Sequence, residues 1–501
     1  MSAASRRPGL RSIAFAALAG CGDSGEATTI AASTGAGTSA GPASEDSGAP
    51  TGGASTGESG SSGSSGAASS GGPPEARGWL RSFGAPDQQR PGGLGFDAVG
   101  DLWVAGDVFG AIDLGEGPLA GEGSGLYLAK FASDGTTVHA QAMFPADGAA
   151  TLTLSSGLAV DSAGAAIVTG WLEGSYTIGG EALVAEELDV FVGKWDAAGL
   201  PVWGRRFGGA DWQVGHAVAV GEDDAIWIAG AALAPFMAGD IAVTGTASTG
   251  LVVLRLGADG TPEFGRWWGD AGDQEALALA VCDDGSVALA GFFTAELKFG
   301  AEVATSAGDK DMFVALLDAQ GEPRWIRGFG GASSDVASHV ACADAVVFAG
   351  VVTGAATIGT LALTPVDQAD AVVGRIELDG ALVWAAGITG PEAQRPGGLG
   401  LRGDGQVLVT LTSAGEATLG ERTLVAVGDE DLVLARYLPP GLTPALLGSL
   451  GDAGTQRAGP LALHEQALAI AGTITGTVAW PGIPSVTATG AQDLALLRVA
   501  E

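Results

Sequence analysis

The stretch WGRRFG, residues 203–208, decides the fold because versions of it recur along the chain. Most versions open on an aromatic or large apolar residue and place a second apolar residue four positions later. Successive versions begin 59 to 64 residues apart, a period typical of repeat architectures. The seven versions are WLRSFG (79–84), HAQAMF (139–144), WGRRFG (203–208), FGRWWG (264–269), WIRGFG (325–330), WAAGIT (384–389) and ALLGSLG (445–451).

Each repeat has the pattern of four short β-strands. In the fourth repeat, for example, the apolar runs ALALAV (276–281) and SVALAG (286–291) flank a Cys-Asp-Asp-Gly turn. Short apolar runs separated by such turns are typical of antiparallel hairpins. Four antiparallel strands in each of seven repeats predict an all-β fold, a seven-bladed β-propeller over residues 78–501.

The two ends of this folded region predict how the ring closes. The sequence stops after DLALLRVAE (493–501), which has the pattern of the third strand of a blade. The folded region starts with WLRSF (79–83), which has the pattern of a fourth strand. We therefore expect the N-terminal strand to complete the last blade, so that the ring is one domain.

Composition limits the classes of partner. The 501 residues include 23 Lys and Arg against 57 Asp and Glu, a formal net charge of −34. Nucleic-acid binding draws most of its affinity from cationic side chains on phosphates, so we expect no nucleic-acid partner. No segment reaches the roughly 18 consecutive apolar residues that a membrane-spanning helix needs.

The N-terminal region has the features of an export signal and a tether. Residues 1–20 combine a basic start with a short apolar run and end directly before Cys21. From there to residue 77 the chain is dominated by Gly, Ser, Thr, Ala and Pro. Such a composition buries too little apolar surface to offset the entropy of ordering, so we expect residues 21–77 to be a disordered linker.

Two resemblances connect these patterns to known proteins. Leu18-Ala19-Gly20-Cys21 resembles the lipobox of bacterial lipoproteins, which implies a signal peptide over 1–20 and lipidation of Cys21 as the mature N-terminus. The segments GLAVDSAGAAIVTG (157–170) and DVFVGKWDAAGLPVW (189–203) are similar to the SBBP-type propeller repeats of bacterial surface lipoproteins. Together they imply an exported chain anchored in the cell envelope, expected on the outer membrane, with the lipid bilayer as a partner.

Three arginines form the candidate binding site. The sequence QRPGGLG stands at 89–95 and again at 394–400, in what we expect to be the loop before the innermost strand. Arg90, Arg395 and Arg457 then share one position in three consecutive blades. Guanidinium groups gathered on one rim would bind a carboxylate, phosphate or sulfate. The alternative interpretation pairs each arginine with a nearby acid such as Asp87 or Glu392.

Other recurring residues have structural interpretations. Cys282 and Cys342 lie near the ends of innermost strands in adjacent blades, which leaves open either a disulfide or two buried thiols. A recurring Gln is expected to latch a loop, a recurring Asp to cap a turn, and a recurring Lys or Arg to form a salt bridge. The members of these sets lie at Gln89, Gln213, Gln274, Gln394 and Gln456; at Asp189, Asp311, Asp370, Asp431 and Asp493; and at Lys130, Lys194, Arg255, Arg375, Arg436 and Arg498.

The sequence predicts neither a cofactor nor a metal. Its four His show no zinc-binding spacing, and no acidic loop has the dense spacing of a calcium site. We expect a monomeric, non-enzymatic binding or scaffolding propeller whose ligand is an envelope protein or a glycan. Two alternatives stay open: an enzyme at the channel mouth, such as a polysaccharide lyase or hydrolase, and purely structural surface display.

Overall fold

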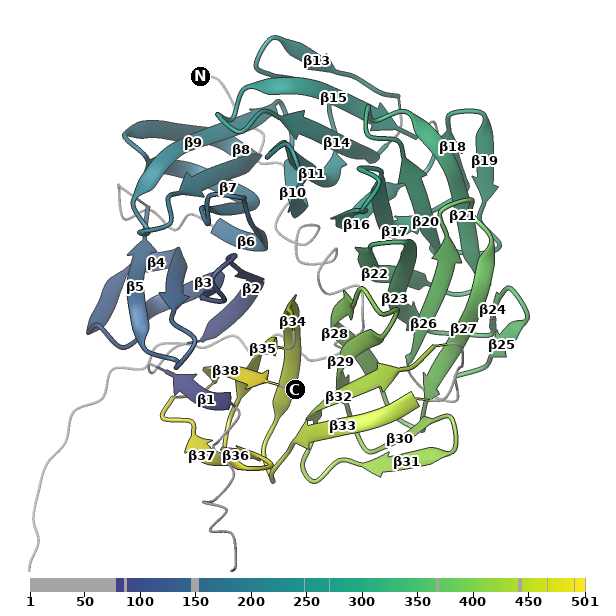
Figure 1. The fold of residues 1–501 in the computed structure, drawn as a ribbon. Coiled ribbons are helices and arrows are strands. Elements are labelled where there is room, and N and C mark those ends of the chain that lie inside the picture. Colours follow the sequence, from purple (N-terminus) through teal and green to yellow (C-terminus); the bar gives the residue numbers. More distant parts are fainter. Residues whose placement is uncertain are drawn as a thin grey trace, which may run out of the picture. The chain divides into compact units, whose positions relative to one another are not determined.

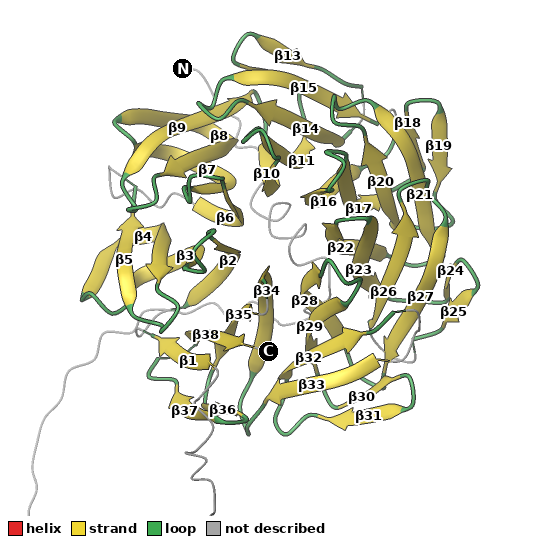
Figure 2. Cartoon of the chain, in the orientation of Figure 1, coloured by secondary structure: helices red, strands yellow, loops and turns green. Residues whose placement is uncertain are grey.

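The computed structural model describes residues 78–84, 88–145, 153–246, 248–269, 271–365, 369–439, 444–465, 467–490 and 492–500. The predicted signal peptide (1–20) and the predicted tether with Cys21 (21–77) lie outside this part of the chain. The regular secondary structure that it contains is entirely β-strand (Figure 2). The strands form sheets arranged in a ring around one axis, so the predicted all-β propeller class is confirmed (Figure 1).

Four sheets have four strands and three have six. In chain order, the first sheet contains β2 (Gln89–Phe96), β3 (Leu102–Asp113), β4 (Pro118–Phe131) and β5 (Thr137–Met143). The second contains β6 (Thr153–Val160), β7 (Ala166–Ile178), β8 (Glu181–Trp195), β9 (Pro201–Gly209), β12 (Phe236–Ala238) and β13 (Ile241–Val243). The third contains β10 (Gln213–Val220), β11 (Ile226–Ala232), β14 (Gly250–Leu256) and β15 (Pro262–Trp268).

The remaining sheets follow the same plan. The fourth contains β16 (Gln274–Val281), β17 (Val287–Phe293), β20 (Asp311–Leu317), β21 (Pro323–Gly331), β24 (Ala356–Ile358) and β25 (Leu361–Leu363). The fifth contains β22 (Asp335–Cys342), β23 (Ala345–Val352), β26 (Asp370–Glu377), β27 (Leu382–Thr389), β30 (Glu416–Leu419) and β31 (Arg422–Val425). The sixth contains β28 (Gln394–Leu401), β29 (Val407–Ser413), β32 (Asp431–Tyr437) and β33 (Pro444–Leu450).

The seventh sheet joins the two ends of the described chain. It contains β34 (Gln456–His464), β35 (Ala467–Ile474), β38 (Asp493–Ala500) and β1 (Gly78–Phe83). Strand β1 pairs antiparallel with β38, with Trp79 opposite Arg498 and Phe83 opposite Leu494. The ring therefore closes as the sequence predicts, with the N-terminal strand as the outermost strand of this sheet.

Short hairpins between the second and third strands of a sheet were not predicted. Strand β12 pairs with β9 of the preceding sheet, and β24 and β30 pair with β21 and β27 in the same way. Two more hairpins, β18 (Glu296–Phe299) with β19 (Glu302–Thr305) and β36 (Thr477–Trp480) with β37 (Ile483–Thr487), form separate two-stranded sheets. Pairing with a hairpin covers part of an outer edge strand, whose unpaired backbone groups would otherwise invite aggregation.

The repeat QRPGGLG lies in strands, which corrects the expectation of a loop. It forms most of β2 and β28, the innermost strands of the first and sixth sheets. Proline is tolerated there because the pairing register shifts directly beside it, between Pro91 and Gly93 and between Pro396 and Gly398. At such a bulge the missing proline N–H leaves no gap in the hydrogen-bond ladder.

The hydrophobic core lies between neighbouring sheets. Between the fourth and fifth sheets, for example, Val314 and Leu316 of β20 cluster with Val346 and Phe348 of β23, and all four are fully buried. Alternate residues of a strand face opposite sides of its sheet, so each sheet packs against both neighbours. This arrangement explains why the apolar runs in the sequence are nearly continuous.

In five sheets, the turn after the third strand packs against the preceding sheet. In the fourth sheet, the Asp318 carboxylate accepts hydrogen bonds from the Gln320 and Glu322 N–H groups, at 2.9 and 2.8 Å. Gly321 in this turn has a φ of 83°, and a Cβ there would lie 2.7 Å from the Phe264 ring. Equivalent glycines lie against the aromatic residues that open the outer strands, in the pairs Gly135 with Trp79, Gly199 with His139, Gly260 with Trp203 and Gly380 with Trp325.

We expect Gly321→Ala to lower the free energy of unfolding by about 2 kcal/mol, because left-handed backbone strain adds to overpacking against Phe264. The matched control is Gly482→Ala, whose φ is 80° and whose Cβ would meet nothing within 4 Å. The control should lower the free energy of unfolding by about 1 kcal/mol only, because it adds backbone strain without overpacking. Urea unfolding of both variants measures the difference, and equal losses would show that the contact with the ring adds nothing.

Candidate functional site

The three candidate arginines lie at one position in adjacent sheets. Each is the second residue of an innermost strand, β2, β28 or β34, and β34 contacts both of the others. The Glu430 carboxylate lies between two of them, 2.6 Å from Arg457 Nε and 3.8 Å from Arg395 Nη1. Arg90 donates to Gln88 Oε1 at 3.2 Å. For Arg395 and Arg457 this geometry matches the alternative interpretation, with Glu430 in place of the acids named from the sequence. Arg90 contacts an amide instead of an acid, and the anion rim stays a prediction.

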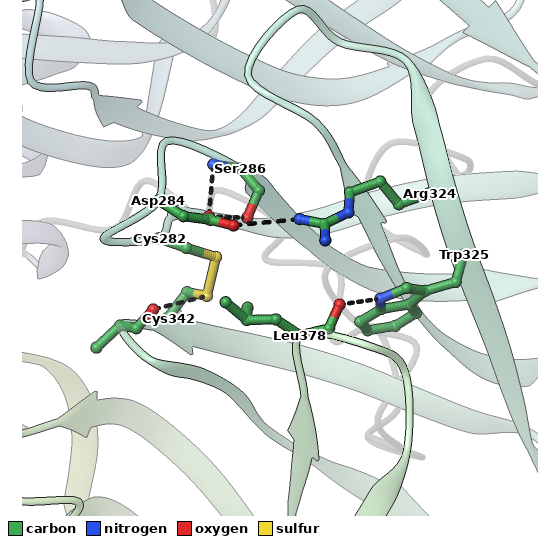
Figure 3. The surroundings of a disulfide bond; sticks show 8 residues. Cys282, Asp284, Ser286, Arg324, Trp325, Cys342 and Leu378 are labelled. Atoms are coloured by element: carbon green, nitrogen blue, oxygen red, sulfur yellow. Dashed lines mark hydrogen bonds and ion pairs between the residues drawn. A yellow bond between two sulfur atoms is a disulfide. The ribbon is translucent and has the colours of Figure 1, made fainter.

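Cys282 and Cys342 form a disulfide in the structure, with their Cα atoms 4.7 Å apart (Figure 3). It joins the ends of the innermost strands β16 and β22, and so the fourth and fifth sheets. One polar contact joins the same sheets nearby, since the Trp325 indole N–H donates to the Leu378 carbonyl at 3.0 Å. Arg324 donates to Asp284 at 3.2 Å within the fourth sheet. The other predicted modification site, Cys21, lies outside the described residues.

The recurring glutamines latch loops, as predicted. All five are fully buried at the first position of innermost strands. The Gln213 side chain accepts from the Gly209 N–H at 2.8 Å and donates to the Ala210 carbonyl at 3.0 Å. The fifth sheet has Asp335 at this position, and its carboxylate accepts from the Thr353 and Gly331 N–H groups, at 3.1 and 2.8 Å. Burial raises the pKa of Asp335 to about 6, with a smaller contribution from nearby Asp311.

Asp335 should make the stability of the domain depend on pH. Its folded pKa of about 6 lies above the unfolded value of ~3.9, so its contribution is most favourable below about pH 4 and is lost as pH rises through 6. We expect this loss to be about 1–2 kcal/mol. Asp335→Asn should remove this dependence of the free energy of unfolding on pH, because the side chain no longer titrates. The expectation holds even if the variant is more or less stable than the wild type at a single pH. Urea unfolding between pH 4 and 7 tests this, and a variant with the slope of the wild type would contradict it.

The recurring basic residues on the third strands form structural ion pairs, as predicted, in the sheets where a turn acid is near. The partners are Lys130 with Asp97 at 2.8 Å, Lys194 with Asp161 at 2.7 Å, Arg255 with Asp223 at 2.7 Å and Arg375 with Asp344 at 3.5 Å. The last pair is the longest, and its Asp344 side chain is 69% exposed, against 5% for Asp97. Asp344 and Arg375 can therefore still form hydrogen bonds with a ligand.

A pocket of about 390 Å³ lies beside that pair, between the fifth and sixth sheets. Strands β26 and β27 place Arg375 and Trp384 directly opposite each other, so both side chains lie on one face of the sheet. Tyr437, the last residue of β32, lines the pocket from the sixth sheet. Val383 of β27 also lines it, and the turns provide the other lining residues, which are Asp344, Gly403, Asp404, Gly405, Leu438 and Pro439.

The aromatic residues of the pocket form a stacked pair. The Trp384 and Tyr437 rings have centroids 5.5 Å apart at an angle of 27°. Trp384 is half-buried, whereas Tyr437 is buried, and burial raises the pKa of the Tyr437 hydroxyl above its usual value of about 10. That buried hydroxyl has no hydrogen-bond partner among the described residues. Tyr437 therefore contributes its ring rather than its hydroxyl to the pocket.

Sequence reasoning missed this pocket, although a signal for it exists. After the third strand, five sheets have a five-residue turn that holds a glycine, as in DAQGE (318–322). The sixth sheet instead has LPPGLT (438–443), and the pocket opens beside the described start of this segment. Leu438 stands where Asp318 accepts the two turn hydrogen bonds in the fourth sheet, so this turn departs from the repeat.

An acid–base pair also lies near the axis. His216 of β10 and Glu275 of β16 approach to 3.4 Å between Nε2 and Oε2, and both side chains are buried. The enzyme alternative would need such a pair in an open cleft, and this one lies inside the protein. Among the described residues, no group of three or more His, Cys, Asp or Glu is arranged to hold a metal ion. This part of the chain also holds no helix long and apolar enough to cross a membrane.

Comparison with solved structures finds distant matches. It is similar to the β-propeller domain of the Trilobed protease from Pyrococcus furiosus, with 8% identity, a TM-score of 0.41, and coverage of 83% of this chain and 94% of that one. Puromycin hydrolase matches with 12% identity, a TM-score of 0.43, and coverage of 80% and 54%. A protein of unknown function from Dyadobacter fermentans matches with 9% identity, a TM-score of 0.35, and coverage of 84% and 99%. No family model and no curated protein matches the sequence.

Proposed function

We propose that this chain is an exported, lipid-anchored β-propeller that binds a ligand without transforming it. A lipid on Cys21 would attach it to the outer membrane, and residues 22–77 would act as the tether. The lipobox-like segment Leu18 to Cys21 supports this anchor. The disulfide between Cys282 and Cys342 supports export, because disulfides persist mainly in oxidising compartments.

The proposed ring has seven blades. Four four-stranded and three six-stranded sheets support this number, since each contains one antiparallel run of four strands from the axis outward. The repeat of the sequence supports it as well. Electron microscopy of the purified chain viewed along the axis tests the number, and six lobes in that view would overturn it.

The pocket between the fifth and sixth sheets is the observation that carries the binding function. It combines a half-buried aromatic ring, a guanidinium and two carboxylates in one concave site, next to the turn that departs from the repeat. Ligand sites are typically concave, with an apolar surface and a few polar groups that fix orientation. A repeat unit that served only as a structural blade would have no need for this departure.

Two measurements test the proposal. Metabolic labelling with a fatty-acid analogue should mark the wild-type chain but not Cys21→Ala. The full chain in detergent should be thermally stabilised by members of a panel of neutral, anionic and cationic small polar compounds, and Trp384→Ala should lose that effect. Phe264→Ala, at the same strand position in the third sheet, is the matched control and should keep it. A panel without any compound that depends on Trp384 would overturn the binding function.

A further inference from the structure

We infer that this pocket binds a neutral carbohydrate ring. The inference rests on the proposed binding function and adds the chemical class of the ligand. A pyranose ring presents C–H groups on its faces and hydroxyl groups around its edge. A site for it therefore needs an apolar platform, together with donors and acceptors in the plane of the ring.

Trp384 provides the platform. One side of its indole is stacked against Tyr437, with centroids 5.5 Å apart, and the ring as a whole is only half-buried. The stacked partner fixes the orientation of the indole, so little side-chain entropy remains to be lost when a ligand packs on it. The polarised C–H groups of a sugar ring are attracted to the electron-rich face of such an aromatic ring.

The polar groups around Trp384 match sugar hydroxyls, which both donate and accept. The Asp344 and Asp404 carboxylates accept hydrogen bonds, and both residues are exposed in turns at the pocket. Arg375 donates from the strand position opposite Trp384. The Tyr437 hydroxyl is buried, so it is not counted among these groups.

The charges disfavour an anionic ligand. Two carboxylates and one guanidinium line the pocket. The guanidinium already lies 3.5 Å from Asp344 and 3.4 Å from Glu377, so its charge is largely balanced. An added carboxylate or phosphate would face uncompensated Asp404, in a protein whose formal net charge is −34.

The same arrangement disfavours a cation on the aromatic ring. A cation would gain most from contact with the face of Trp384. That position lies beside Arg375, its cross-strand neighbour, and like charges in such a pair repel. A neutral ring avoids both penalties, because its hydroxyls can bind the acids and the arginine at once.

The test compares sugars that share a ring and differ in charge. The full chain in detergent is titrated with the neutral, uronic-acid and amino forms of glucose, galactose and mannose, at a pH that keeps the acid and the amine ionised. Quenching of tryptophan fluorescence and calorimetry report binding. At least one neutral sugar should bind about tenfold tighter than its charged forms, a difference of about 1.4 kcal/mol.

Variants separate this inference from the proposed function. Asp404→Asn should lower the affinity for the neutral sugar about tenfold, because a hydrogen-bond acceptor is lost. It should also reduce the difference in affinity between the neutral sugar and its uronic acid, because a negative charge that repels the acid is lost. Asp283→Asn makes the same change at an exposed turn residue of the fourth sheet and should have no effect. A charged form that bound tightest through Trp384, or the failure of every neutral sugar, would overturn the ligand class. Only the loss of every Trp384-dependent ligand in the wider panel would overturn the binding function itself.

Discussion

Cys282→Ala/Cys342→Ala should lower the free energy of unfolding by about 2–4 kcal/mol. The bond joins residues 60 apart in sequence, and closing a loop of that length restricts the unfolded chain by ~4 kcal/mol. The expected loss is smaller than this bound because the denatured chain keeps some residual order. The variant should still fold, because the Trp325 hydrogen bond and the apolar cluster between the fourth and fifth sheets remain.

Urea unfolding with and without a thiol reductant measures this effect. Reductant should destabilise the wild type and leave the double variant unchanged, and the two should agree when both are reduced. Alkylation under denaturing conditions counts the free thiols independently. An unreduced wild type with the same unfolding midpoint as the double variant would contradict the prediction.

The same bond has a second expected effect, on the pocket. Asp344 lies two residues after Cys342, in the turn that the disulfide attaches to the fourth sheet. Reduction should therefore weaken ligand binding by a modest factor, while Trp384 and Tyr437 keep the platform in place. The disulfide thus connects the stability of the ring to the shape of its candidate site.

Sequence periodicity predicts the parts of this fold that repeat. The phrase beginning at Trp203 marks an outer strand in every unit, and the turn that contains Gly321 recurs in five sheets. Hairpins such as β12 with β13 are not predicted, because three-residue strands are too short for an alternating pattern to stand out. Their pairing depends on the edge of the preceding sheet, which no local signal describes.

The candidate sites also include one part that the sequence predicts and one that only the packing shows. Equal spacing correctly places Arg395 and Arg457 at one position of neighbouring strands. It cannot show that Glu430, which comes from the segment before β32, reaches both of them. The pocket is the reverse case, because LPPGLT (438–443) departs visibly from the repeat, yet only packing shows that Trp384 and Tyr437 meet beside it. The departure from the repeat is therefore a better guide to the candidate pocket than the repeat itself.

Removal of β1 should have the largest effect of any change considered. Deletion of residues 1–84 exposes the edge of β38 along six paired positions and removes the buried side chains of Leu80 and Phe83. Each of these side chains contributes about 2–3 kcal/mol, and the lost strand pairing adds to that. The sum, above ~5 kcal/mol, is comparable with the whole stability of a typical domain.

The truncated chain should therefore unfold or aggregate through the open edge of β38, as unpaired strand edges do. Deletion of residues 1–76 is the matched control and should leave the unfolding midpoint unchanged, because β1 remains. A peptide covering residues 77–84, added in excess, should partly restore folding by supplying the missing strand. Leu80 and Phe83 lie in different apolar clusters, Leu80 with residues of the sixth and seventh sheets and Phe83 with residues of the first and seventh. If the chain without β1 kept the stability of the control, the closure of the ring through this strand would be wrong.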